Sequence, residues 1–162
     1  MNVVNEIERM SPLLILIYIS IGYLQGTETV QFLIGFGINN FSNHFIKNYI
    51  FKPLMKNKSF PLLGNGKRPK GAKDCGIISD GKKSTSYGMP SGHAQTIGFF
   101  LMDRLSGNYT PLYKIIVSII CIIFITSRIR LNCHTPQQTI IGTLFGFVAY
   151  KIYLTISSMF IS

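Results

Sequence analysis

Two short segments of the chain carry the residue types that could do chemistry. The first, residues 90–93, reads Pro-Ser-Gly-His, and the second contains Arg128, His134 and Gln138. An imidazole can transfer a proton or act as a nucleophile near neutral pH, and a guanidinium can hold phosphate oxygens with two parallel hydrogen bonds. Two histidines and an arginine that meet beside a helix N-terminus would therefore form a site for a phosphate group.

The first segment has the pattern of a helix start. Ser91 is a favourable N-cap, which places Gly92 and His93 in the first helical turn, where free backbone N–H groups attract anions. Gly92 would let a ligand approach the backbone closely, and His93 could give a proton to a leaving oxygen. The plainer alternative is a capped helix start whose histidine lies at a membrane interface.

The second segment also precedes a predicted helix. Residues 135–136, Thr-Pro, favour a helix start because proline is best tolerated at the first helical position. Gln138 lies four residues after His134, so its side-chain carbonyl can accept a hydrogen bond from one imidazole nitrogen and leave the other free to attack. Arg128 would supply a bidentate phosphate donor. Its alternative role is to compensate the negative end of the preceding helix.

The elements that must position these residues are apolar. Of the 162 residues, 47% are hydrophobic and 14% charged, which is too apolar for an ordinary soluble domain. The apolar runs are residues 12–24, 30–51, 94–105, 112–126 and 139–161. A spanning helix needs about 20 apolar residues, so the sequence predicts one all-α integral membrane domain, residues 1–162, with about five transmembrane helices. A signal peptide is the alternative for the first run, but Glu6 and Glu8 stand where its positive region belongs.

A basic segment separates the second run from the third. Residues 52–89 hold nine lysines and arginines against two aspartates and are broken by prolines and glycines, which predicts a long extramembrane loop. If each run crosses the bilayer once, this loop and the turn before His134 lie on the same face. The lysines alone are also explained by a cytoplasmic connection under the positive-inside rule. Cys75 and Cys133 share this face and could pair in an oxidising compartment if their geometry permits.

Together these residues resemble the signatures of the type-2 phosphatidic acid phosphatase superfamily, which also includes vanadium haloperoxidase-like proteins. Its phosphatases act on lipid phosphates and diphosphates in membranes. Residues 90–93 match the second signature, and Ser127 and Arg128, followed after five residues by His134, match the third. The resemblance covers about residues 52–142, the expected catalytic core.

Two positions depart from the family pattern. The first signature is a lysine, six residues and then Arg-Pro; Arg-Pro is present at residues 68–69, but Pro61 stands in the lysine position. Lys58 or Lys67 could take that role. The third signature usually ends with an aspartate, where this chain has Gln138. Glutamine at this place is similar to the dolichyl diphosphatase branch and also to a sugar phosphatase branch.

The resemblance implies a mechanism. His134 would be the nucleophile that forms a phosphohistidine, with its ring held by Gln138. His93 would be the general acid and then the base that activates water, so a neutral His134 and a protonated His93 would give a bell-shaped pH–rate profile. The donors that would hold the phosphate oxygens are the side chains of Arg128, Arg68 and Lys67 and the backbone N–H groups of Ser91 and Gly92.

The sequence thus predicts a metal-independent membrane phosphatase of lipid phosphates or diphosphates, such as polyprenyl or dolichyl diphosphate or phosphatidate. We expect a multi-pass protein of the endoplasmic reticulum or a derived membrane, with the lipid substrate and the bilayer as partners. No cofactor, metal or nucleic acid is expected, and the oligomeric state is left open. A soluble sugar phosphate is a further candidate substrate. The alternative function is a non-catalytic, basic lipid-headgroup binder, which Pro61 and Gln138 motivate.

Overall fold

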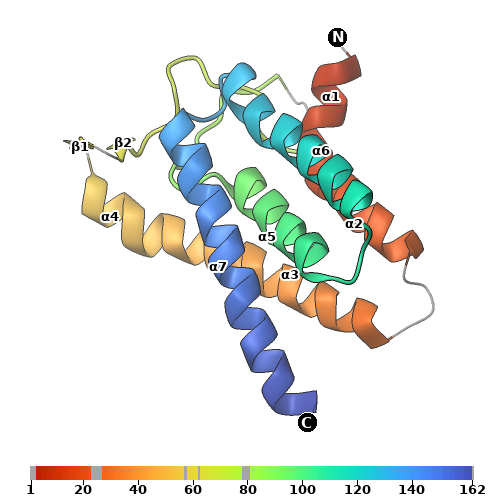
Figure 1. Ribbon diagram of the computed structural model, residues 1–162. Helices are drawn as coiled ribbons and strands as arrows, with labels where there is room; N and C mark the ends of the chain where they lie inside the picture. The colour runs from red at the N-terminus through yellow and green to blue at the C-terminus, as the bar shows by residue number, and fades with distance from the viewer. Residues whose placement is uncertain (1–2, 23–26, 57, 62, 78–80, 162) are drawn as a thin grey trace.

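The computed structural model describes residues 3–22, 27–56, 58–61, 63–77 and 81–161. The fold is mostly helical (Figure 1). Its elements are α1 (Val3–Arg9), α2 (Ser11–Gly22), α3 (Thr27–Phe45), the π-helix η1 (Ile46–Phe51), α4 (Lys52–Met55), β1 (Ser59–Phe60), β2 (Gly64–Asn65), α5 (Gly92–Ser106), α6 (Pro111–Arg130) and α7 (Pro136–Ile161).

Each of the five apolar runs forms a helix, namely α2, α3 with η1, α5, α6 and α7. The predicted helix starts are also present, because Ser91 caps α5 and the hydroxyl of Thr135 accepts the Gln138 backbone N–H at 3.3 Å. The short helix α1 was not predicted. Its polar residues, Glu6, Glu8 and Arg9, gave it no apolar pattern.

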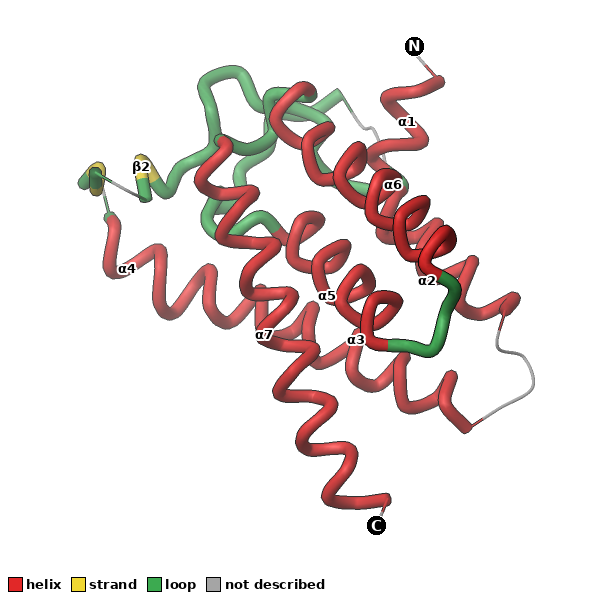
Figure 2. The backbone as a smooth tube through the Cα atoms, viewed as in Figure 1, coloured by secondary structure: helices red, strands yellow, loops and turns green. Residues whose placement is uncertain are grey.

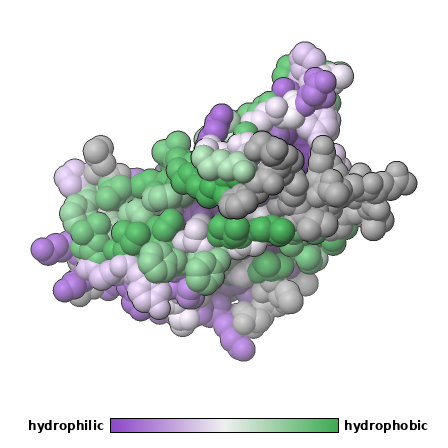
Figure 3. Space-filling view, turned by 90° about the horizontal axis from the view of Figure 1, so that it is seen from below, coloured by the Kyte–Doolittle hydropathy of each residue, from purple (hydrophilic) through white to green (hydrophobic). Residues whose placement is uncertain are grey.

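Only part of the membrane prediction is tested by the fold. Among the described helices, α6 and α7 alone combine the length and the mean hydropathy, 2.1 and 1.5, of a membrane span. Only 17% and 22% of their most apolar windows are buried, so most of these apolar side chains face outward rather than into a core. Hydrophobic residues also form patches on the face of the molecule that Figure 3 shows. The chain therefore has two helices that could span a membrane, and five crossings are not established.

The helix α5 forms the centre of the bundle and contacts α2, α3, α6 and α7 (Figure 1). Its side chains Ile97 and Phe99 are fully buried in the main hydrophobic core. The α5–α7 contact is the closest, because glycines let the two backbones approach. A Cβ atom at Gly98 would lie 2.6 Å from the Thr143 carbonyl oxygen, and one at Gly146 would overlap the α5 backbone.

The segment between α4 and α5 was expected to be a long loop without secondary structure. It contains the two-stranded antiparallel pair β1–β2, with Phe60 opposite Gly64, and an isolated bridge between Lys73 and Lys83. This segment and the turn between α6 and α7 lie together at one end of the bundle (Figure 2). A disulfide between Cys75 and Cys133 joins them. The two segments that sequence analysis singled out thus meet at this end.

Candidate active site

The starts of α5 and α7 are held together through their backbones. The peptide bond between Met89 and Pro90 is cis, and the Ser91 backbone N–H donates to the Gln138 backbone carbonyl at 3.1 Å. The Ser91 hydroxyl caps α5 by accepting the Ala94 N–H at 3.4 Å. A Cβ atom at Gly142 would lie 2.5 Å from the Ser91 carbonyl oxygen, so a glycine is needed there. The two histidine segments are therefore positioned by one rigid helix pair.

His134 is buried and its ring orientation is fixed by Gln138. The Gln138 side-chain nitrogen donates to the Lys67 carbonyl at 2.7 Å, and its oxygen accepts the Thr135 backbone N–H at 3.3 Å. The same oxygen lies 3.1 Å from His134 Nδ1, which must therefore be the protonated nitrogen. The other nitrogen, Nε2, carries the lone pair that a nucleophile needs.

Arg68 lies directly in front of this lone pair. Its Nη1 is 3.0 Å from His134 Nε2 and donates to the Cys133 carbonyl at 2.9 Å. Its Nη2 donates to the Ser86 hydroxyl at 2.9 Å. Burial lowers the pKa of Arg68 to about 10, which leaves the guanidinium charged at neutral pH. A positive charge is thus held where the nucleophile would meet phosphorus.

Arg128 is fully buried, with a relative exposure of 0%. Its Nη2 donates to the Cys75 carbonyl at 2.9 Å, whereas Nε and Nη1 have no hydrogen-bond partner in the described part of the chain. A buried guanidinium with unpaired donors is costly unless an anion completes it. The His134 backbone N–H donates to the Arg128 carbonyl at 3.1 Å, so the backbones of these two residues lie together.

His93 has a partner that the sequence did not suggest. Its Nε2 lies 3.1 Å from the backbone carbonyl oxygen of Arg9 in α1, so Nε2 carries the proton that it donates to this oxygen. Burial, together with the positive charges of Arg128, Arg68 and Lys47, lowers the pKa of His93 to about 3. These effects favour the neutral imidazole of His93, and its protonated form as the general acid stays a prediction.

Lys47, in η1, is a further residue of the site. Burial, then the positive charges of Arg68, Lys47 and Arg128, hold the pKa of His134 well below its usual value. Arg68 is close enough to Lys47 for their charges to interact. Since Lys47 affects both histidines and is affected by Arg68, it belongs to the same cluster of positive charge. A lysine inside an apolar run was the available signal.

The packing of the helix around Lys47 also places this residue near His93. Asn43 precedes it by about one helical turn, and a Cβ atom at Gly92 would lie 3.1 Å from the Asn43 side-chain oxygen. Phe51, four residues after Lys47, packs with Met89 in a small hydrophobic cluster. The helix face with Asn43, Lys47 and Phe51 thus lies against the segment that leads into His93.

The remaining predicted residues have smaller parts. Lys58 and Lys67 are exposed, and neither is among the charges that lower the pKa of the histidines; Lys67 contributes its backbone carbonyl to Gln138. The two candidates for the missing lysine of Pro61 thus lie outside the charge cluster that contains Lys47. His44 is exposed, its backbone carbonyl accepts a hydrogen bond from the Asn48 side chain at 2.9 Å, and it lies outside the site.

The site is rich in positive charge and poor in acid. No group of three or more histidine, cysteine or acidic side chains that could hold a metal occurs among the described residues. The groups that can stabilise an anion are the guanidinium groups of Arg68 and Arg128, the ammonium of Lys47 and the N-terminus of α5. This arrangement, with a lone pair on His134 Nε2, suits the transfer of a phosphoryl group.

The comparison with protein families agrees with this arrangement. The model of the PAP2 superfamily matches residues 28–161, and the chain belongs to this superfamily, whose members include phosphatases of lipid phosphates. The match starts with α3 and includes every residue of the site apart from the α1 contact to His93. No curated protein and no solved structure was found to match the chain.

Proposed function

We propose that the protein is a membrane-embedded phosphatase that removes phosphate from a lipid phosphate or diphosphate through a phosphohistidine at His134. Membership of the PAP2 superfamily supports the class of reaction. The single observation that carries the proposal is the buried Arg128 guanidinium, whose Nε and Nη1 have no partner among the described residues although the site already carries further positive charge. A phosphate with two negative charges would complete it.

In this mechanism His134 Nε2 attacks phosphorus, a new N–P bond forms, and the bond from phosphorus to the leaving oxygen breaks. Arg68, which donates to Nε2 before substrate binds, turns its Nη1 to a phosphate oxygen. Arg128 and Lys47 offset the negative charge of the other oxygens. Water then attacks the phosphohistidine, which releases inorganic phosphate and restores the Nε2 lone pair.

His93 would gain its proton together with the substrate. The charges that lower its pKa are Arg128, Arg68 and Lys47, and a bound phosphate opposes all three. His93 can then protonate the leaving oxygen and later accept a proton from the attacking water. Because Nε2 already carries the proton donated to the Arg9 carbonyl, the proton gained with the substrate goes to Nδ1.

The proposed substrate is an amphiphile. The outward-facing apolar residues of α6 and α7 support a bilayer location, and we propose that the five apolar helices all lie within it. A site at one end of such a bundle holds a phosphate at headgroup depth. Gln138, which fixes the tautomer of His134 as an aspartate would, favours an active enzyme of the dolichyl diphosphatase type, with polyprenyl diphosphate or phosphatidate as substrates.

The disulfide supports one orientation in the membrane. Cys75 and Cys133 are paired, and their carbonyl oxygens accept hydrogen bonds from Arg128 and Arg68 respectively. Disulfides form in oxidising compartments, so we propose that this end of the bundle faces a lumen or the cell exterior rather than the cytosol. A membrane-impermeant, thiol-reactive reagent applied to sealed vesicles after reduction would test this, since only outward-facing cysteines react from outside.

The alternative function is a non-catalytic lipid-headgroup binder. It is favoured by the contacts of the two histidines, because Arg68 contacts His134 Nε2 and the Arg9 carbonyl accepts the hydrogen bond from His93 Nε2. A binder would use the same cations to hold a phosphate headgroup without cleaving it.

The test is phosphate release by detergent-purified protein from polyprenyl diphosphate and from phosphatidate, with EDTA, beside His134→Ala and His93→Ala. We expect release by the unaltered protein, none by His134→Ala, and a rate reduced by about 10²- to 10⁴-fold for His93→Ala. No release from folded protein, or release that does not depend on His134, would exclude the phosphohistidine mechanism. Retained binding of phosphatidate in that case would select the headgroup binder.

A further inference from the structure

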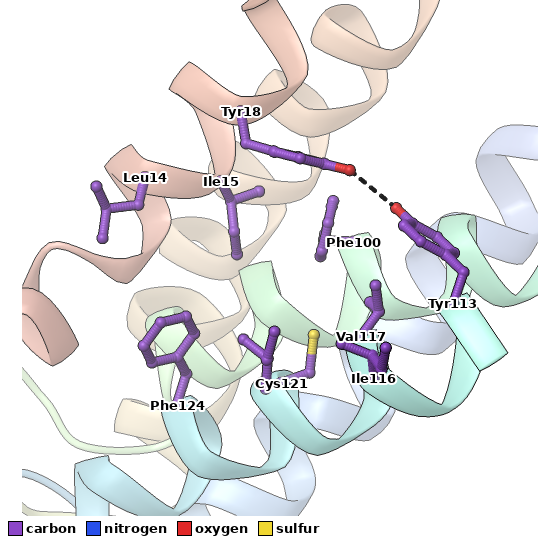
Figure 4. A pocket seen from close by; sticks show the side chains of 10 residues that line it. Leu14, Ile15, Tyr18, Phe100, Tyr113, Ile116, Val117, Cys121 and Phe124 are labelled. Carbon is purple, nitrogen blue, oxygen red and sulfur yellow. Dashed lines mark hydrogen bonds between the residues drawn. The ribbon is translucent and has the colours of Figure 1, made fainter. Parts of the chain in front are cut away.

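A groove of about 300 Å³ lies between α2, α5 and α6. Figure 4 shows side chains from the three helices facing one another across it, with Leu14 and Ile15 opposite Cys121 and Phe124. Its lining is almost wholly apolar. The hydroxyls of Tyr18 and Tyr113 close one end, at 3.1 Å from each other.

The face of α6 that lines the groove continues into the candidate site. Val117, Cys121 and Phe124 line the groove, and Arg128 follows Phe124 by one helical turn. The spacing of four, three and four residues keeps these side chains on one face of the helix. Val117, Cys121 and Arg128 are all buried. The groove wall and the unpaired guanidinium are thus successive parts of one stripe.

The walls of the groove on α5 and α2 also lead to the candidate site. Phe100 lines the groove from α5 and lies seven residues, or two turns, after His93. On α2, Ile15 lines the groove, and Ser11, one turn before it, is fully buried. Glu8 of α1, three residues before Ser11, pairs with Arg130. Helical hydrogen bonds through Met10 keep α1 and α2 in register. All three walls therefore run from the groove to the positive cluster.

The groove has a defined length. From Phe124 to Tyr113 the helix α6 advances eleven residues, or about 16 Å. At one end the groove stops at Phe124, one helical turn before Arg128, and at the other end it reaches the pair of tyrosine hydroxyls. This arrangement fits a phosphate that carries one apolar chain. Its charged head would lie at Arg128, and about 16 Å of its hydrocarbon would lie in the groove.

We propose that this groove binds one hydrocarbon chain of the lipid whose phosphate occupies the site at His134, and that its length sets the chain-length preference. The inference rests on the proposed lipid phosphatase function. A second groove, lined by residues of α3, η1, α5 and α7, does not involve α6, the helix that carries Arg128. It supplies the control position.

Occupancy can be measured without turnover. The chain has no Trp, so Phe124→Trp places a single fluorophore in the groove, and Phe145→Trp places one in the second groove. In proteoliposomes, we expect phosphatidate with brominated chains to quench Phe124→Trp saturably, and at equal mole fraction more strongly than brominated phosphatidylcholine. Unbrominated phosphatidate should reverse the quenching. Phe145→Trp should be quenched equally by both lipids.

Equal quenching of Phe124→Trp by both brominated lipids would overturn the proposal, because ordinary bilayer lipid would then cover the groove. Quenching specific to phosphatidate with no phosphate release would retain the groove and reject the proposed catalysis. The two failures are therefore distinguishable.

A filled groove supplies a kinetic test. In Val117→Phe, we expect kcat/KM to fall about tenfold for long-chain phosphatidate and to be unchanged for an alkyl phosphate of four carbons. Ala149→Phe, in the second groove, should leave the ratio of the two substrates unchanged. An equal loss for short and long chains in Val117→Phe would count against chain binding, and the fluorescence measurement still decides if this variant does not fold.

Discussion

Gln138 holds His134 in one tautomer: its amide oxygen lies 3.1 Å from Nδ1, while its amide nitrogen donates to the Lys67 carbonyl at 2.7 Å. The second contact is what fixes the direction of the first, because it decides which end of the amide faces the ring. An amide can therefore do here what a carboxylate does elsewhere in orienting the imidazole, although it adds no negative charge.

Gln138→Ala should lower kcat about tenfold with little change in KM, because the ring loses its orienting acceptor but the phosphate donors remain. Steady-state kinetics with a lipid phosphate will show the split. Gln137→Ala is the matched control, since Gln137 lies exposed at the preceding position of α7. A rise in KM with unchanged kcat would mean that Gln138 contacts the substrate rather than His134.

Lys47→Gln should raise KM by about 10- to 100-fold, because a charge-assisted contact to phosphate is lost, and Lys47→Arg should retain most of the affinity. Inhibition by inorganic phosphate should weaken in parallel. Lys58→Gln removes the same charge at an exposed position outside the site and should change neither value. Equal effects of Lys47→Gln and Lys58→Gln would indicate a long-range electrostatic effect instead of a bound phosphate.

The stability of the protein should depend on pH through the buried histidines. The pKa of His93 is about 3 in the folded protein against 6.5 in an unfolded chain, so the unfolded state binds more protons between these values. The stability contributed by a neutral His93 is complete above pH 6.5 and is lost as pH falls towards 3. We expect the thermal unfolding midpoint to drop by several degrees between pH 6.5 and 4.5.

The comparison for this pH effect is His93→Asn, whose midpoint should depend less steeply on pH over the same range. His134 acts in the same direction, so the dependence should be reduced rather than abolished. A midpoint that is flat from pH 6.5 to 4.5 in the unaltered protein would show that His93 is not held neutral by burial.

Gly146→Ala should destabilise the protein by about 1–3 kcal/mol or prevent its folding, because the added methyl would overlap the α5 backbone at the closest helix contact. Gly37→Ala is the control, since a Cβ atom at Gly37 has no neighbour within 4 Å. There alanine should be neutral or stabilising by up to about 1 kcal/mol. Denaturation in one detergent will compare the two; similar stabilities would contradict the close α5–α7 packing.

Local signals in the sequence were enough to predict much of the fold. Ser91 and residues 135–136 marked two helix starts because capping depends on a few neighbouring residues. The apolar runs predicted the five main helices, but not how many cross a membrane, since α2 has only 12 residues and span length is a separate property. The π-helix η1 left no local pattern that could be read.

The site was predictable only where its contacts are local. His134 and Gln138 are one turn apart, so their hydrogen bond could be expected from spacing. The contact of His93 with Arg9 joins residues 84 positions apart, and Lys47 reaches the cluster through tertiary packing alone. The pairing of Cys75 with Cys133 depended on geometry in the same way, because no sequence pattern specifies which cysteines approach.

The glycine contacts between α5 and α7 also determine which parts of the protein can accept amino-acid substitutions. The helix α5, which holds His93, and the helix α7, which follows His134, meet backbone to backbone, so larger side chains have no place at Gly98, Gly142 or Gly146. By contrast, the walls of the apolar groove on α2 and α6 consist of side chains, which can be exchanged without moving a backbone. New substrate ranges, in nature or in directed evolution, should therefore arise on α2 and α6, while the reaction itself stays constant.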